Sequence, residues 1–173
     1  MHINIEIKAR CKNHEHIRQV LLSRNARFIG IDHQIDTYFK VDEGRLKLRQ
    51  GNIENALIFY KRTDQRGPKK SEVQLFRFSE NGDALKEVLT ASNGVQKIVD
   101  KKRAIYFVEN VKIHLDDVKN LGTFVEIEAI EPKQLNPSSP DVEEAALHNQ
   151  CQVLMHVFHI QEKDLISHSY CDL

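Results

Sequence analysis

Regular alternation of apolar with polar or charged residues is the feature of this sequence that most constrains its fold. In the opening segment, Ile3, Ile5 and Ile7 alternate with polar residues at positions 4, 6 and 8. Successive side chains of a β-strand point to opposite faces, so this segment has one apolar and one charged face. The same period of two recurs along most of the chain, and it predicts a protein built mainly of antiparallel strands.

Four of these alternating segments are joined in pairs, which favours two β-hairpins. Residues 31–41 and 45–50 are separated by a short turn that ends in Gly44. Residues 57–63 and 71–78 are separated by a loop that contains glycine and proline. Further segments with strand character are 95–100, 102–109, 111–115 and 122–130.

Three or four helices are expected between and after the strands. Asn13 is a suitable N-cap for a helix that extends to about residue 23. A second helix over 83–91 is expected to stop near Gly94, and Pro140 suits the first position of a third helix. A last short helix is expected over 162–166. The third helix has apolar residues at helical spacing, which predicts core packing for Leu147, Cys151, Leu154, Met155 and Phe158.

Together these elements predict an α+β protein whose antiparallel sheet of about eight strands is closed or strongly curved. A chain of 173 residues without a dividing linker fits one domain over 1–173. The three cysteines form no CxxC pair, which indicates reduced thiols in a cytoplasmic protein. No apolar run reaches the roughly 18 residues of a membrane span, and the N-terminus has no signal-peptide pattern.

The charged residues are sorted by sign along the predicted strands. Arg45, Lys47 and Arg49 share one face of a strand, with neighbours only about 7 Å apart. On a single strand, charges on one face usually just face solvent. Here the pattern repeats on several strands, which favours a basic surface that faces an anion. The cations in comparable alternating positions are Lys8, Arg62, Lys101, Arg103 and Lys112.

Acidic residues show the complementary pattern. Glu126 and Glu128 share one strand face, and two carboxylates this close repel each other unless a cation lies between them. Mg²⁺ typically binds one or two carboxylates while substrate phosphates fill its remaining positions. Glu6 and Asp116 are the further acidic candidates. This arrangement predicts a barrel interior that holds a metal-bound phosphorylated substrate, with Arg and Lys on the remaining phosphate oxygens. The zero formal net charge argues against a dedicated nucleic-acid binder.

Several motifs in this sequence resemble those of the CYTH superfamily, the triphosphate tunnel metalloenzymes. The opening NIEIKAR is similar to the ExExK signature of that family, and the segment KIHLDDVKNLGTFVEIEA is the most specific match. Other matching segments are DTYFKV, GRLKLR, LIFYKR, GPKKSEV, KKR at 101–103 and the terminal SYCDL. The whole set most resembles the branch of class IV adenylate cyclases, which is related to the thiamine triphosphatases.

The resemblance implies a closed tunnel of eight antiparallel strands that uses Mg²⁺ or Mn²⁺. It implies metal ligation by Glu6, Asp116, Glu126 and Glu128. It implies phosphate binding by Lys8, Arg45, Lys47, Arg49, Arg62, Lys101, Arg103 and Lys112, with Arg62 favoured over Lys61 by the family pattern and by strand alternation. The expected catalytic residues are Lys8, Arg49, Arg62 and His114, although His114 suits a structural or substrate-positioning role better than that of a general base.

Asn4 is the main departure from the family pattern, because it replaces the first acid of ExExK. A carboxamide oxygen can ligate Mg²⁺ but supplies no charge and cannot act as a base. The replacement is compatible with a single metal, with a different substrate or with weak activity. Tyr170 in the C-terminal tail is expected either to close one mouth of the barrel or to cap the core.

The expected function is a metal-dependent phosphohydrolase that acts on an inorganic or organic triphosphate or on a related phosphoester. Three alternatives remain open: a class IV-type adenylate cyclase, a hydrolase of other cyclic or linear phosphodiesters, and a phosphate-binding module without turnover. The expected partner is a small phosphorylated substrate, with no nucleic acid and no membrane. The chain is expected to be a monomer or a homodimer.

Overall fold

The computed structural model describes residues 2–79, 82–131 and 140–173. Its strands are β1 (His2–Arg10), β2 (Arg27–Phe39), β3 (Arg45–Gly51), β4 (Ala56–Arg62), β5 (Lys69–Arg77), β6 (Val95–Val108), β7 (Val111–Val118) and β8 (Gly122–Ile130). Its helices are α1 (His14–Ser23), α2 (Asp83–Asn93) and α3 (Pro140–Val157), followed by the short 3₁₀ helices η1 (Glu162–Asp164) and η2 (Tyr170–Asp172).

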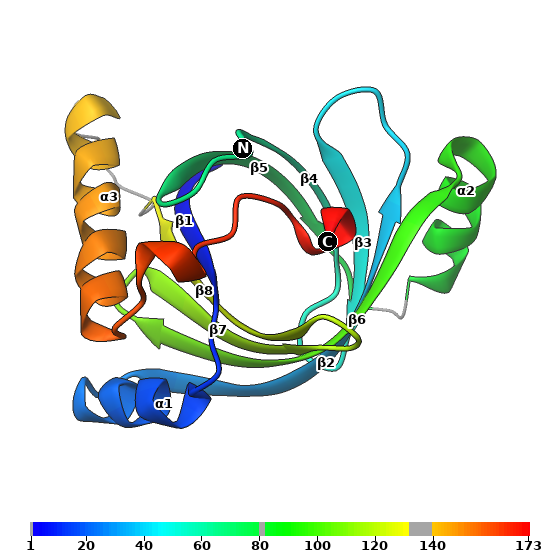
Figure 1. Cartoon of the computed structure of the whole chain (residues 1–173). Coiled ribbons are helices and arrows are strands. Elements are labelled where there is room, and N and C mark those ends of the chain that lie inside the picture. The colour runs from blue at the N-terminus through cyan, green and yellow to red at the C-terminus, as the bar shows by residue number, and fades with distance from the viewer. Residues whose placement is uncertain (1, 80–81, 132–139) are drawn as a thin grey trace.

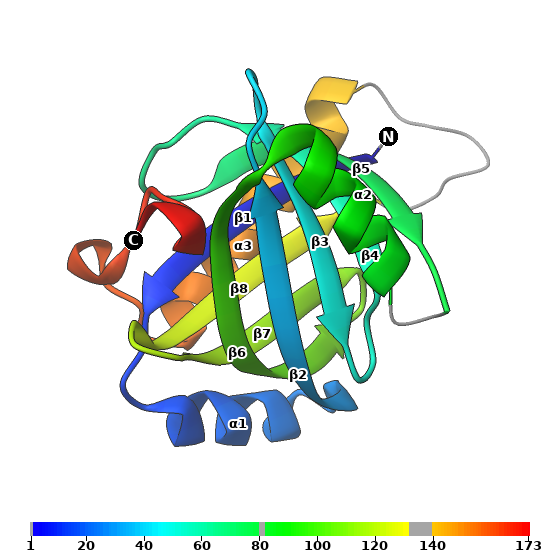
Figure 2. The ribbon, with the colours of Figure 1, turned by 90° about the vertical axis from the view of Figure 1, so that its right-hand side faces the viewer.

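The strands close into a barrel in the order β1-β5-β4-β3-β2-β6-β7-β8. Every neighbouring pair in this order is antiparallel. Figure 1 looks into the barrel and shows the ring of strands with the helices outside it. Figure 2 shows the strands from the side, crossing the barrel at an angle. The predicted α+β class and the closed antiparallel barrel are both confirmed.

Two predicted segments turn out to be one strand. Residues 95–100 and 102–109 are expected as separate stretches, but the structure joins them in the 14-residue β6. Lys101 keeps the alternation between Val99 and Arg103, and no turn residue interrupts the chain there. The predicted last helix is also shorter than expected, because only Glu162–Asp164 adopts 3₁₀ geometry.

The main hydrophobic core lies outside the barrel, between its wall and the helices α1 and α3. On β1, Ile5 and Ile7 point outward into this core, where they are at most 1% exposed. Cys151 and Leu154 of α3 pack into the same cluster, as Figure 1 shows for α3 beside β1 and β8. The apolar strand faces therefore point outward to the helices, and the charged strand faces line the barrel interior.

Local signals in the sequence set the helix ends. The side chain of Asn13 accepts a hydrogen bond from the backbone N–H of His16 at 3.1 Å, which confirms it as the N-cap of α1. Gly94 ends α2 with a φ of +76°, in the left-handed region that favours glycine. Among the described residues, no helix is long and apolar enough to cross a membrane.

The C-terminal tail returns to the barrel after α3. The backbone N–H of Ile166 donates to the carbonyl of Lys8 at 2.9 Å, and Leu165 forms an isolated bridge with Ala9. From there the tail runs across one mouth of the barrel, as the red segment in Figure 1 shows. Tyr170 is only 2% exposed. The tail thus closes this mouth, which is one of the two arrangements expected for Tyr170.

Candidate functional site

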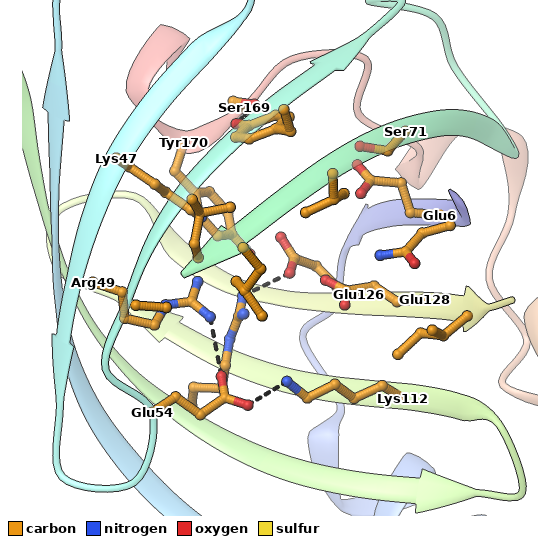
Figure 3. A pocket seen from close by; sticks show the side chains of 18 of the residues that line it. Glu6, Lys47, Arg49, Glu54, Ser71, Lys112, Glu126, Glu128, Ser169 and Tyr170 are labelled. Atoms are coloured by element: carbon orange, nitrogen blue, oxygen red, sulfur yellow. Dashed lines mark hydrogen bonds and ion pairs between the residues drawn. The ribbon is translucent and has the colours of Figure 1, made fainter. Parts of the chain in front are cut away.

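A cavity of about 270 Å³ occupies the barrel interior. All eight strands and the C-terminal tail contribute side chains to it, and Figure 3 shows these side chains converging from opposite walls. Because the inner positions of neighbouring strands lie side by side, residues far apart in the sequence meet here. Most of the alternating charges predicted from the sequence thus come together in this cavity.

The lining of the cavity is more basic than acidic, although the whole chain has no net charge. Among the described residues, seven basic side chains line it: Lys8, Lys47, Arg49, Arg62, Arg77, Arg103 and Lys112. Four acidic side chains line it: Glu6, Glu54, Glu126 and Glu128. A net positive, largely enclosed surface of this kind attracts a multiply charged anion.

Asp36 is the centre of one ionic cluster in the barrel wall. Its carboxylate is fully buried and accepts hydrogen bonds from Lys47 at 3.1 Å, Arg49 at 2.9 Å and Lys101 at 2.5 Å. Burial alone would raise the pKa of Asp36, but these three cations hold it well below its usual range. Burial lowers the pKa of Lys101 to about 7, against the attraction of Asp36. Asp36 therefore fixes the direction in which Lys47 and Arg49 enter the cavity.

A second cluster surrounds Arg103. The guanidinium donates to Asp116 at 2.7 and 2.5 Å and to Glu126 at 2.6 Å. The hydroxyl of Tyr170 also donates to Asp116, at 2.7 Å, and Lys8 pairs with Glu126 at 2.7 Å. The Nζ atom of Lys8 lies 3.3 Å from the centre of the Tyr170 ring, a cation–π contact. This cluster ties the C-terminal tail to the charged wall.

A third cluster joins the tail to β1 and β4. Arg62 forms an ion pair with Glu6 and donates to the hydroxyl of Ser169 at 2.7 Å. The hydroxyl of Tyr60 also meets Ser169, at 2.8 Å. The Nε–H of Arg62 is buried and has no hydrogen-bond partner within the described chain. One donor of the Arg62 guanidinium is thus left without an acceptor from the protein.

The loop between β3 and β4 shapes the mouth opposite the tail. Glu54 in this loop accepts from Arg49 at 3.1 Å and pairs with Lys112, as the dashed lines in Figure 3 show. The carboxylate of Asp32 accepts from the backbone N–H groups of Ile53 at 2.8 Å and Glu54 at 3.0 Å. At Gly51, a Cβ atom would lie 2.7 Å from that carboxylate, so glycine permits the close approach. The loop is therefore held in place by a buried acid.

Three side chains form a group that could hold a metal ion. Ligand atoms of His114, Glu126 and Glu128 all lie within 4.8 Å of one another. Nε2 of His114 has no hydrogen-bond partner among the described residues. Burial lowers the pKa of His114, which favours the neutral imidazole that a metal requires. Carboxylate oxygens suit Mg²⁺ and Mn²⁺, so Glu126 and Glu128 fit a divalent cation.

The predicted site residues fall into three positions relative to the cavity. Nine of them line it: Glu6, Lys8, Lys47, Arg49, Arg62, Arg103, Lys112, Glu126 and Glu128. Lys101, Asp116 and His114 are buried behind the lining, where they hold other charged groups. Arg45 lies at the rim and pairs with Asp64 and Asp172. The carboxylate of Asp116 accepts from Arg103 and Tyr170, and it is not among the three residues whose ligand atoms lie within 4.8 Å of one another.

Several residues of the site are absent from the sequence-based predictions. Asp36 and Tyr38 lie on the inner face of β2, and the alternation of 32, 34, 36 and 38 is a signal that could have found them. Arg77 at the end of β5 is a further lining cation. Glu54 belongs to a loop, where no periodicity applies, and only the three-dimensional structure brings it to Arg49 and Lys112.

A closed eight-stranded barrel whose interior is lined by paired acids and bases defines a charged-tunnel protein. This chain belongs to the CYTH domain family, whose family model matches residues 2–169. The match confirms the resemblance drawn from NIEIKAR and the later motifs. No curated protein sequence matches the chain.

Solved structures with the same fold cover nearly the whole chain. The PH1012 protein of Pyrococcus horikoshii is 25% identical, with a TM-score of 0.77 and 98% of each chain covered. A Vibrio parahaemolyticus protein described as a candidate adenylate cyclase is 17% identical, with a TM-score of 0.75 and 98% and 96% coverage. A Hippeastrum protein, described as a candidate adenylyl cyclase with dominant triphosphatase activity, is 16% identical, with a TM-score of 0.60 and 98% and 91% coverage.

Proposed function

We propose that this protein is a metal-dependent phosphohydrolase that acts on a triphosphate or a related phosphoester inside the barrel. The observation that carries the proposal is the cavity lining, with seven basic against four acidic side chains among the described residues. The described triphosphatase activity of the Hippeastrum protein agrees with the proposal, but at 16% identity it supports the fold alone. The proposal therefore rests on the side chains of this chain.

The basic side chains are proposed to bind and orient the phosphate groups. Lys47 donates to Asp36 at 3.1 Å and to the hydroxyl of Tyr38 at 3.5 Å, which leaves the third donor of its ammonium group for a ligand, and the Nε–H of Arg62 has no partner within the described chain. Such preset donors stabilise negative charge that develops on phosphate oxygens without rearranging during the reaction. Arg49 and Arg103 keep their direction because Asp36 and Asp116 hold them. The paired acids thus preorganise the anion site.

Glu126 and Glu128 are the proposed holders of a divalent ion. When bound, Mg²⁺ or Mn²⁺ would neutralise charge on phosphate oxygens as a Lewis acid. His114 contacts Glu126 at 3.2 Å and Glu128 at 3.5 Å, so its proposed role is to hold these carboxylates in position.

The proposal is tested by a substrate panel. Purified protein is incubated with tripolyphosphate, ATP, thiamine triphosphate and linear and cyclic phosphodiesters, each with Mg²⁺, with Mn²⁺ and with a chelator. We expect metal-dependent release of phosphate or diphosphate from at least one substrate. Formation of cyclic AMP from ATP would instead identify a cyclase, and tight binding of the anions without turnover would identify a binding module.

A further inference from the structure

The cavity is apolar along part of one wall. On β4 and β5, Ile58, Val73 and Leu75 occupy inner positions where other strands carry charges. With Ala56 and Tyr60 they form a hydrophobic cluster of their own, separate from the core outside the barrel. Phosphate oxygens gain nothing from such a surface, because an ionised group loses hydration there without gaining a partner. This wall therefore suits an uncharged part of a ligand.

The apolar wall continues to the mouth formed by the loop between β3 and β4. Ile53 in this loop lines the cavity and is 42% exposed, although its backbone N–H is fixed by the buried carboxylate of Asp32. Ile130 at the end of β8 lines the cavity as well. An exposed apolar side chain on a loop that is held in place presents a ready-made surface to a ligand that enters from this mouth.

Two buried polar side chains lie where the charged and the apolar parts meet. Ser71 on β5 is the register partner of Asn4 on β1 and of Arg62 on β4. The next inner residue on β5 is Val73, about 7 Å further along the strand. Figure 3 shows Ser71 beside Glu6 in the wall of the cavity. Asn4 and Ser71 thus lie at the boundary between the Glu6–Arg62 ion pair and the apolar wall.

Neither polar side chain is satisfied by the protein. Oδ1 of Asn4 and Oγ of Ser71 have no hydrogen-bond partner among the described residues, and the two side chains are 6% and 1% exposed. A buried acceptor without a donor is costly, so such groups usually have a partner in the working state. A ligand with an N–H or O–H group beside Asn4 and Ser71 would supply the missing donor.

We propose that the tunnel is selective for an organic phosphate over an inorganic one. The phosphate groups would lie among Lys47, Arg62 and the neighbouring cations. The uncharged organic group would extend along Ile58, Val73 and Leu75 toward the loop mouth, with a hydrogen-bond donor directed at Asn4 and Ser71. This inference rests on the proposed function of the tunnel as a phosphate site. It also assigns Asn4 to the substrate, where the family pattern has an acid.

The inference is tested by calorimetric binding to the full chain, with EDTA present so that no metal-dependent turnover occurs. The probes are inorganic tripolyphosphate, ATP and GTP, because the nucleoside groups of the last two are uncharged and carry N–H and O–H donors. We expect at least one organic triphosphate to bind about tenfold or more tightly than tripolyphosphate, the selectivity that one or two buried apolar groups provide. Equal or weaker binding of both organic probes overturns the inference, while the phosphate site itself stands. Failure of all three probes both in EDTA and in a repeat with Mg²⁺ overturns the proposed function too.

Two variants locate the selectivity on the β5 wall. Val73→Thr keeps the shape of the side chain but adds a polar atom, and Ser71→Ala removes the hydroxyl. Each is expected to reduce the ratio of organic to inorganic affinity severalfold. The matched control Val88→Thr lies on α2 with 63% exposure and should keep the ratio. An unchanged ratio in both β5 variants overturns the inference. If Val73→Thr fails to fold, Ser71→Ala still decides, because it removes a hydroxyl that bonds to nothing in the described chain.

Discussion

At the scale of single residues, the barrel interior depends on carboxylates that hold cations in place. Asp36 is the clearest case, since one fully buried carboxylate accepts from Lys47, Arg49 and Lys101. Its removal would leave these cations close together without a counter-charge. Removal of one partner of a buried ion pair typically lowers the free energy of unfolding by about 3–5 kcal/mol. Asp36 is therefore expected to matter for stability and for the direction of the anion-binding side chains.

Asp36→Asn keeps the size of the side chain and removes its charge. We expect the free energy of unfolding to fall by about 3–5 kcal/mol, measured by urea denaturation at neutral pH. The matched control is Asp42→Asn, which changes an exposed residue in the turn between β2 and β3. Equal stability of the two variants would show that the Asp36 cluster does not support the barrel.

At the scale of elements, α3 covers the outer, apolar face of β1 and β8. Leu154 is buried in this contact, whereas Val153 on the same helix is 45% exposed. Truncation of a buried leucine leaves a cavity and typically costs about 2–5 kcal/mol. Leu154→Ala is therefore expected to lower the urea midpoint clearly, and Val153→Ala only slightly. Similar midpoints for both variants would contradict the assignment of the core to the outside of the barrel.

The C-terminal tail is the second element whose role can be tested. The hydroxyl of Tyr170 donates to the buried carboxylate of Asp116 at 2.7 Å. Tyr170→Phe keeps the ring over Lys8 but leaves Asp116 with one donor fewer, at an expected cost of about 1–3 kcal/mol. Thermal unfolding measures this cost, with Tyr106→Phe on the outer side of β6 as the control. A Tyr170→Phe variant as stable as the wild type would show that the tail contact is dispensable.

At the scale of the whole molecule, equal numbers of acidic and basic residues are distributed unequally in space. Positive charge prevails around the cavity, although the total is zero. This positive charge lowers the pKa values of the acids that hold the cations. The cations around Asp36 and Glu54 outweigh the effect of burial and lower the pKa of both carboxyls. This shift links the stability of the fold to pH.

The sign of that link follows from proton uptake. In the unfolded chain, Asp36 and Glu54 take up protons near pH 4, whereas in the folded protein they do so only at lower pH. Their stabilising contribution is therefore complete well above pH 4 and is lost as the pH falls from about 5 downward. We expect the urea midpoint to drop between pH 6 and pH 3.5, and to drop less in Asp36→Asn. An equal drop in both proteins would contradict the role of Asp36.

Much of the fold could be predicted from the sequence because a strand has a simple periodicity. The alternation in β1, β3 and β8 correctly separates an apolar from a charged face. The direction of these faces could not be read from the alternation itself, since either face can point inward. The apolar stripe of α3 needs an apolar partner, and the outer faces of β1 and β8 supply it. The family resemblance added the closed tunnel.

The candidate site was only partly predictable for a related reason. Periodicity identifies the face on which Lys47 or Glu126 lies, but it does not show which acid meets which base. Asp36 and Glu54 were missed. The alternation along β2 is a signal that could have found Asp36, whereas Glu54 lies in a loop, where no periodicity applies. The buried position of Asp116 behind Arg103 also depends on the tertiary structure. Local sequence patterns thus identify the charged residues, but the ion pairs between them depend on the closed barrel.

The central claim is that the charged tunnel performs metal-assisted phosphate chemistry, and Glu128→Gln tests it most directly. Phosphate release from tripolyphosphate, ATP and thiamine triphosphate is measured with Mg²⁺ or Mn²⁺, with Glu72→Gln on the exposed face of β5 as the control. We predict that the wild type and Glu72→Gln release phosphate only when the metal is present, and that Glu128→Gln is slower by about 100-fold or more. Turnover that survives both the chelator and Glu128→Gln, or no turnover by the wild type of these substrates or of linear and cyclic phosphodiesters, would contradict the claim.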